Sequence, residues 1–186
     1  MMFVYQKEVL IVGGDDSNHA GDKVGEVIVA IFSHNYEDSI VKRNLKFSRG
    51  YLEKTINWVN SDRRDYRFTL LTEDKYRHSS ANLVYVVPKL ISNYLEDTNE
   101  NPEVLKIYLD GFLSSHGKIH IKKNFPGINR MVVDNFIKKR KENGKFSKKL
   151  ECPLVVYHAD ILAHFLFKST TSIENFLNHS KFVLVK

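Results

Sequence analysis

The pattern of apolar and polar residues predicts four strands in the first two thirds of the chain. Residues 8–14 and 24–33 are apolar, β-rich runs separated by polar residues, which predicts two strands joined by a polar loop. Apolar and polar residues alternate over 65–72, and a fourth β-rich run over 103–109 ends at Asp110. The chain is therefore expected to begin with antiparallel strands.

Apolar residues at helical spacing predict four helices. The first covers residues 51–60, and a longer one covers 79–95, with serines at its start and a kink or a break at Pro88. Residues 128–141 and 159–167 complete the set, and the last helix is strongly apolar.

Short elements close the chain. Residues 154–157 are expected to form a short buried strand, 173–179 a helical turn and 181–185 a last strand. Strands thus come first and then alternate with helices, which predicts an α/β fold with a mixed β-sheet flanked by helices. No repeat or Pro-rich linker divides the sequence, so residues 1–186 are expected to form a single domain.

The composition of the 186-residue chain is typical of a globular protein. With 42% hydrophobic and 27% charged residues, it is too rich in apolar side chains for a disordered protein. The apolar run at 27–32 is far shorter than the roughly 20 residues of a membrane helix. A single cysteine, Cys152, excludes an internal disulfide and a cysteine-rich zinc site. We therefore expect a cytoplasmic protein that does not interact with membranes.

The net charge of +6 is concentrated in one segment. Residues 118–149 hold eleven Lys or Arg against two acidic residues, so the rest of the chain is slightly acidic. We interpret this segment as a basic insertion that binds nucleic acid, whether RNA, DNA or a hybrid; a solvated lysine-rich surface is the alternative. Phe125, set among the lysines, is a candidate for stacking on bases, or else part of a turn. The residues assigned to substrate binding here are Lys122, Lys123, Lys138 and Lys139.

Acidic residues follow three of the predicted buried strands. Asp15 and Asp16 follow the first strand, Asp110 the fourth, and Asp160 the short strand near the end of the chain. Because the carboxyl ends of neighbouring strands line one crevice in an open α/β sheet, these side chains are expected to converge. A divalent cation would offset their repulsion, and oxygen ligands favour Mg²⁺ or Mn²⁺ over zinc. The alternative is local: turns at the first three residues and a helix cap at Asp160.

A cluster of this kind is typical of in-line displacement at phosphorus. Two metal ions about 3.5 to 4 Å apart activate the attacking water and stabilise the leaving oxygen. The sequence therefore predicts a metal-dependent nuclease with Asp15, Asp16, Asp110 and Asp160 as metal ligands. His19, beside the acidic pair, is a candidate contact to phosphate or a proton shuttle, or else a solvated loop residue.

Three motifs resemble those of the ribonuclease H-like superfamily, and most closely the type 2 ribonucleases H. They are Asp-Asp-Ser-Asn-His-Ala-Gly after the first strand, Tyr-Leu-Asp-Gly, and His-Ala-Asp-Ile-Leu-Ala-His at a late helix. In this resemblance Asp15 takes the place of the first-strand aspartate and Asp16 that of the adjacent glutamate. Asp110 takes the place of the middle-strand aspartate and Asp160 that of the helix-start aspartate. The resemblance implies a ribonuclease H-like fold, two bound divalent metals and cleavage that leaves a 3′-hydroxyl.

Two departures from the type 2 pattern leave a second function open. Ser17, Asn18 and His19 stand where type 2 enzymes have a Gly-Arg-Gly that recognises a ribose 2′-hydroxyl. Asp16 is one methylene shorter than the usual glutamate. The first difference affects ribonucleotide recognition and the second affects the second metal site. The alternative function is a non-catalytic nucleic-acid-binding or scaffold protein that keeps the fold.

Overall fold

The structure is a computed structural model. It describes residues 9–17, 25–34, 40–43, 49–61, 63–71, 79–111, 113–136, 150–169, 174 and 176–185. Among the predicted site residues, His19, Lys138 and Lys139 lie outside these ranges. Within the described ranges, no helix has the length and apolar character needed to cross a membrane.

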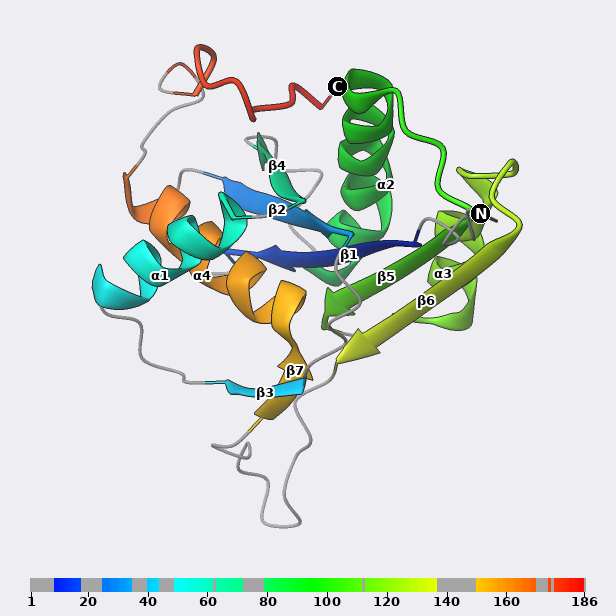
Figure 1. The fold of residues 1–186 in the computed structure, drawn as a ribbon, viewed down its shortest axis with the longest axis horizontal. Coiled ribbons are helices and arrows are strands. Elements are labelled where there is room, and N and C mark those ends of the chain that lie inside the picture. The colour runs from blue at the N-terminus through cyan, green and yellow to red at the C-terminus, as the bar shows by residue number, and fades with distance from the viewer. Residues whose placement is uncertain are drawn as a thin grey trace, which may run out of the picture.

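Five strands form the main sheet (Figure 1). In the order in which they lie across the sheet, they are β4 (Arg64–Leu71), β2 (Glu26–Ser33), β1 (Val9–Asp16), β5 (Val104–Asp110) and β6 (Arg130–Phe136). β2 is antiparallel to both β1 and β4, whereas β5 runs parallel to β1 and β6 runs parallel to β5. The parallel pairs need crossover connections, and helices supply them. The prediction of a mixed α/β sheet flanked by helices is confirmed.

Helices cover both faces of this sheet (Figure 1). Their bounds are α1 (Arg49–Val59), α2 (Ser79–Thr98), α3 (Ser115–Lys123) and α4 (Leu154–Ser169). α2 and α3 pack on one face, and α4 packs with α1 on the other. A separate two-stranded sheet, β3 (Ile40–Arg43) with β7 (Leu150–Pro153), contacts α4. The described part of the predicted basic insertion therefore belongs to α3 and β6, within the main layers.

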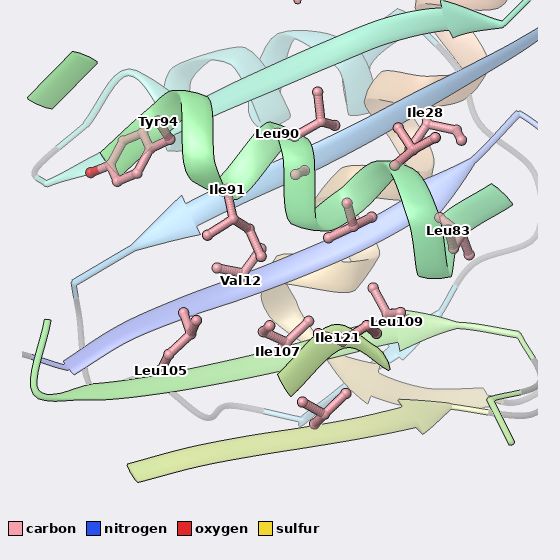
Figure 2. Packing of buried hydrophobic residues seen from close by; sticks show 14 of the residues in the cluster. Val12, Ile28, Leu83, Leu90, Ile91, Tyr94, Leu105, Ile107, Leu109 and Ile121 are labelled. Carbon is pink, nitrogen blue, oxygen red and sulfur yellow. The ribbon is translucent and has the colours of Figure 1, made fainter. Parts of the chain in front are cut away.

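Alternation of side chains along the strands divides the core into two clusters. Val12 of β1 packs with Leu90 and Ile91 of α2 on one face (Figure 2). Val9 and Ile11 of the same strand belong to the cluster under α4 on the other face. A strand buried on both faces needs apolar residues at nearly every position, which explains the unbroken apolar run of β1.

A glycine allows α4 to lie directly on β1. A Cβ atom at Gly13 would lie 2.4 Å from the carbonyl carbon of Val155 and 2.6 Å from the backbone nitrogen of Val156. These are main-chain atoms in the first turn of α4, so no side-chain rotation can relieve the overlap. The absence of a side chain at Gly13 therefore sets how closely the start of α4 approaches the sheet.

The segment predicted as a helix over 128–141 is a strand, β6, over 130–136. The pattern fits both periods, because Ile128, Met131 and Val132 lie at helical spacing while Met131 and Val133 lie at strand spacing. In the structure Met131 and Val133 pack in the α2 cluster, and Val132 is exposed on the opposite face. Pairing with β5, which a single-sequence pattern does not show, selects the strand.

Several other elements differ from the prediction. Residues 154–157, predicted as a strand, form the first turn of α4, because a short apolar run does not distinguish a buried strand from a buried helix. α2 runs unbroken through Pro88, so the predicted break there is wrong. α3 and β3 were not predicted, and both are short segments rich in polar residues.

The last described residues run along the outer edge of β4. The N–H of Phe68 donates to the carbonyl of Lys181 at 3.1 Å, and the N–H of Val183 donates to the carbonyl of Phe68 at 2.8 Å. Phe182, between them, forms a parallel bridge with Phe68. The strand predicted over 181–185 is thus a single bridge that covers this edge of the sheet.

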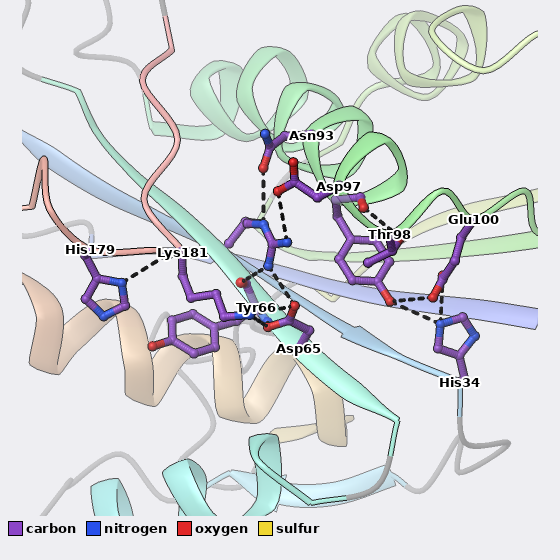
Figure 3. A network of polar contacts seen from close by, with 11 residues as sticks. His34, Asp65, Tyr66, Asn93, Asp97, Thr98, Glu100, His179 and Lys181 are labelled. Carbon is purple, nitrogen blue, oxygen red and sulfur yellow. Dashed lines mark hydrogen bonds and ion pairs between the residues drawn. The ribbon is translucent and has the colours of Figure 1, made fainter.

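A polar network joins β4, α2 and the C-terminal segment (Figure 3). Arg67 is buried and donates to Asp65 at 2.7 Å, Asn93 at 3.1 Å and Asp97 at 3.2 Å. Lys181 Nζ lies 2.7 Å from the carboxylate of Asp65. Burial acts to raise the pKa of Asp65, but the bonds from Lys181 and Arg67 outweigh it, and the pKa is lowered. The buried guanidinium is thus balanced by carboxylates from two elements.

Candidate functional site

β1 and β5 end side by side, and each ends with an aspartate. Their parallel register pairs Gly14 with Leu109, so the next residues, Asp15 and Asp110, are neighbours across the two strands. Neighbouring strands lie about 5 Å apart. At that spacing, two carboxylates on the same face are close enough to share one cation.

Asp15 and Asp110 lie on the face of the sheet that α4 covers in part. On β1, Ile11 packs in the α4 cluster and Gly13 contacts the α4 backbone, so alternation places Asp15 on that side. On β5, Leu109 packs in the α2 cluster, so Asp110 lies on the opposite, α4 side. The fold therefore places these two residues on the same face of neighbouring strands.

The backbone around Asp15 holds its carboxylate in place. Asp15 is only 4% exposed, and its Oδ1 accepts the backbone N–H of Asp16 at 2.8 Å. Ser17, two residues after Asp15, hydrogen-bonds to β2. Its N–H donates to the carbonyl of Val27 and its Oγ accepts the N–H of Val27, both at 2.9 Å. The ladder therefore continues past Asp15.

Asp16 lies on the other face of the sheet. Its carboxyl group hydrogen-bonds with Glu26 at the start of β2, and the amide of Asn82 in α2 donates to Glu26. Burial raises the pKa of Glu26, and the bonds with Asn82 and Asp16 act against that rise. Because successive residues of a strand point to opposite faces, the sheet separates Asp16 from Asp15. Glu26 and Asn82 were not predicted from the sequence.

Asp160 lies in the second turn of α4, because the helix begins at Leu154. It therefore does not cap the helix. His158 faces α1, where it contacts Thr55, and Ala159 is buried in the cluster under α4. At 100° per residue, Asp160 is on the flank of α4 opposite His158. Since α1 packs beside β4, that opposite flank is the one toward β5, where Asp110 lies.

The donor chemistry suits a divalent cation, although the ligands do not form a closed set. Asp15, Asp110 and Asp160 share the α4 side of the sheet and offer only oxygen atoms, which Mg²⁺ and Mn²⁺ prefer. Across the described residues, no three His, Cys, Asp or Glu side chains are placed to hold a metal ion. The two strand-end carboxylates of Asp15 and Asp110 lie on neighbouring strands and on one face of the sheet, and their binding of a metal ion stays a prediction.

Two of the predicted substrate-binding lysines lie at the opposite end of the sheet from these aspartates. Lys122 and Lys123 end α3 and are exposed. β6 begins shortly after them, at Arg130, and advances about 20 Å in the strand direction before it reaches the level of Asp110. Phe125 is buried in the core and lies in the turn after α3, so the base-stacking interpretation is wrong and the alternative of a turn is confirmed.

The turn after Asp110 is braced by β6. Gly111 has a φ of 108°, a conformation that glycine adopts without strain. The side-chain amide of Asn135 donates to the carbonyl of Gly111 at 3.0 Å. On the same strand, Asp134 accepts a 3.0 Å hydrogen bond from Lys118, which lowers the pKa of Asp134. Asn135 was missed because its segment was predicted to be helical.

His158 holds α4 against α1. Its Nδ1 lies 2.8 Å from the hydroxyl of Thr55, and its ring stacks on Trp58 with 4.1 Å between the ring centroids. Burial, with a smaller contribution from Arg64, lowers the pKa of His158 to about 4. The imidazole is therefore neutral at pH 7. These contacts fix the rotation of α4 and hence the flank on which Asp160 lies.

Comparison with known proteins finds similar folds among solved structures. No protein-family model and no curated protein matches the sequence. A chain of the PCNA:RNase HII complex from Archaeoglobus fulgidus is 13% identical, with 95% of this chain and 83% of that chain covered and a TM-score of 0.46. Ribonuclease H2 from Pyrococcus horikoshii is 18% identical, with 94% and 81% covered and a TM-score of 0.47. The likeness to the ribonuclease H-like fold concerns the fold alone, and the chemistry depends on the residues of this chain.

Proposed function

We propose that this protein hydrolyses phosphodiester bonds of nucleic acid at the edge of the sheet where β1 and β5 end. The observation that carries the proposal is the adjacency of Asp15 and Asp110, which lie on neighbouring strands and on the same face. Two carboxylates on neighbouring strands and on one face repel each other, and a divalent cation bound between them offsets that repulsion. Phosphate esters are one class of substrate on which such a bound cation acts.

Each aspartate has a separate part in the proposed site. Asp15, held by the ladder and nearly buried, and Asp110, at the braced turn, would bind Mg²⁺ or Mn²⁺ between them. Asp160 would add a ligand from the flank of α4. When bound, the ion activates water and offsets the charge that develops on the phosphate. Asp16 takes no part in this proposal, because its carboxyl group is engaged with Glu26 on the other face.

The basic residues would contact the nucleic acid away from the reacting phosphate. Lys122 and Lys123 are exposed at the far end of the sheet, and a bound strand or duplex would have to extend along β6 to meet them. His19, Lys138 and Lys139 remain proposed contacts on the basis of the sequence. The class of nucleic acid, RNA, DNA or hybrid, is decided by the assay below.

The test is a cleavage assay with labelled RNA, DNA and hybrid in Mg²⁺ or Mn²⁺. Replacing Asp15 or Asp110 by Asn is expected to lower kcat by about 10²-fold or more, because a ligand of the ion is removed. Asp16→Asn is the matched control: it makes the same change on the next residue of β1, and it should leave kcat within a few fold. Equal losses in Asp15→Asn and Asp16→Asn would contradict the assignment.

The structure also favours a second candidate function, a nucleic-acid-binding protein without hydrolytic activity. The observation behind it is that the described residues hold no gathered group of three metal-binding side chains. Water-proton relaxation with Mn²⁺ separates the two functions. A nuclease should bind Mn²⁺ and lose that binding in Asp110→Asn, whereas the binding protein should retain nucleic acid without binding Mn²⁺ and cleave none of the three substrates.

A further inference from the structure

α4 covers only part of its side of the main sheet. The helix packs mainly on β1 and β2, and β6 lies two strands away from β1 (Figure 1). On β6, Val132 is 46% exposed and Arg130 is exposed on this side. On β5, the partly buried Val104 and Tyr108 pack against the cluster under α4, so β5 borders the part of the sheet that this cluster covers.

Charge changes from basic to acidic along β5 and β6 on this side of the sheet. The strand register places Arg130 at the level of Val104, and Lys106 follows two residues later on β5. Both Lys106 and Arg130 belong to the α4 side by alternation. At the other end of β5 lies Asp110, the proposed cation ligand. Between the two ends, Asp134 is ion-paired with Lys118 at 3.0 Å, so it adds little net negative charge.

We propose that the sugar-phosphate backbone of the substrate lies along β5 and β6, with phosphates at Arg130 and Lys106 and the scissile phosphate at Asp110. This inference rests on the proposed function and specifies how its substrate is held. Nucleic acid is a polyanion, so its phosphates can contact Arg130 and Lys106 along the strands. One phosphate can then lie at the cation proposed to bind at Asp110, where the reaction occurs. Glu103 immediately precedes β5, and Lys106 and Arg130 together carry one more charge than it does.

The register converts this placement into a length requirement. Lys106 precedes Asp110 by four residues on the same strand, about 13 Å at 3.3 Å per residue. Val104, which pairs with Arg130 across the strands, precedes Asp110 by six residues, about 20 Å. At 3.4 Å per base pair, these contacts lie about four and six base pairs from the reacting phosphate. The substrate must therefore extend about six base pairs to one particular side of the cleaved bond.

The cleavage test uses duplexes that share one cleavage site and are shortened on either side of it. Removing the outer base pairs on one side, so that about three remain, should raise KM about 10-fold or more while kcat changes little. The same shortening on the other side of the cleavage site should leave KM unchanged. Arg130→Ala should raise KM for the long duplex and weaken the length effect, because shortening then removes only the contact with Lys106. Lys54→Ala, which removes one exposed cation from α1 three strands away, is the matched control.

Binding measurements decide the inference independently of cleavage. In a salt titration with intact duplex, Arg130→Ala and Lys106→Ala should each flatten the log-log slope by up to about 0.9, and Lys54→Ala should leave it unchanged. Equal slopes for Arg130→Ala and Lys54→Ala, or equal effects of shortening on both sides, would overturn the proposal. If the slopes change as expected but no substrate is cleaved, the proposed hydrolysis fails and the binding path stands.

Discussion

The contact between His158 and Thr55 predicts that acid weakens the packing of α4 on α1. Burial, aided by Arg64, lowers the pKa of His158 to about 4 in the folded protein, whereas an unfolded histidine titrates near 6.5. As the pH falls below 6.5, His158 becomes protonated in the unfolded chain but stays largely neutral in the folded protein until the pH nears 4. The contribution of His158 to stability is therefore complete above pH 6.5 and is lost progressively between 6.5 and about 4.

The size of this effect follows from the shift. One pKa unit corresponds to ~1.4 kcal/mol, so a change from 6.5 to about 4 lowers the free energy of unfolding by about 3 kcal/mol across that pH range. That is a large fraction of the 5–15 kcal/mol typical of a domain. The residue is 7% exposed, so solvent screens the shift little.

Urea denaturation over this pH range, in wild type and His158→Gln, measures the effect. Glutamine can still hydrogen-bond with Thr55 but does not titrate, so the variant should lose about 3 kcal/mol less than wild type between neutral pH and pH 4. The difference between the two proteins removes the contribution of other titrating groups. His116→Gln, at an exposed position in α3, is the control and should follow wild type. Parallel pH profiles for wild type and His158→Gln would refute the reasoning.

Two further predictions concern packing and buried charge. Gly13→Ala should destabilise the protein by several kcal/mol, since its Cβ would overlap main-chain atoms of α4. Gly14→Ala should cost less, because it meets the movable side chains of Leu109 and Val87; equal losses in urea denaturation would contradict this account. Arg67→Ala should cost about 1.5–3 kcal/mol, because Asp65 and Asn93 would each lose a buried hydrogen-bond donor while Lys181 keeps its ion pair with Asp65. A loss below 1 kcal/mol in thermal unfolding would show that the network adds little.

Strand ends could be predicted from the sequence because buried strands have a continuous apolar pattern. The runs before Asp15 and Asp110 identified β1 and β5, and their neighbouring positions follow from the general behaviour of α/β sheets. Asp160 was identified as the acidic residue that follows a strand predicted over 154–157, but those residues form the first turn of α4, because their apolar pattern fits a strand or a helix equally well. The side of α4 on which Asp160 lies depends on contacts with α1, which the sequence does not reveal.

The separation of Asp16 from Asp15 was missed because β1 was predicted to end before them. A strand that includes both residues must direct them to opposite faces, so the position of one strand boundary decided the prediction. The partners of Asp16 could not be found in this way, since Asn82 reaches Glu26 only through the packing of α2. β6 was mistaken for a helix because its pairing with β5 lies outside any local pattern.

The bridge between Phe182 and Phe68 bears on how the chain can be shortened or fused. A sheet edge with open N–H and C=O groups is a template for pairing with another molecule, and here the last described residues occupy it. A chain cut before Lys181 would expose the backbone of Phe68 and also lose the ion pair with Asp65. Self-association through β4 is then the expected failure of such a truncation. Fusion partners are therefore better joined to this end through a linker that leaves 181–183 in place.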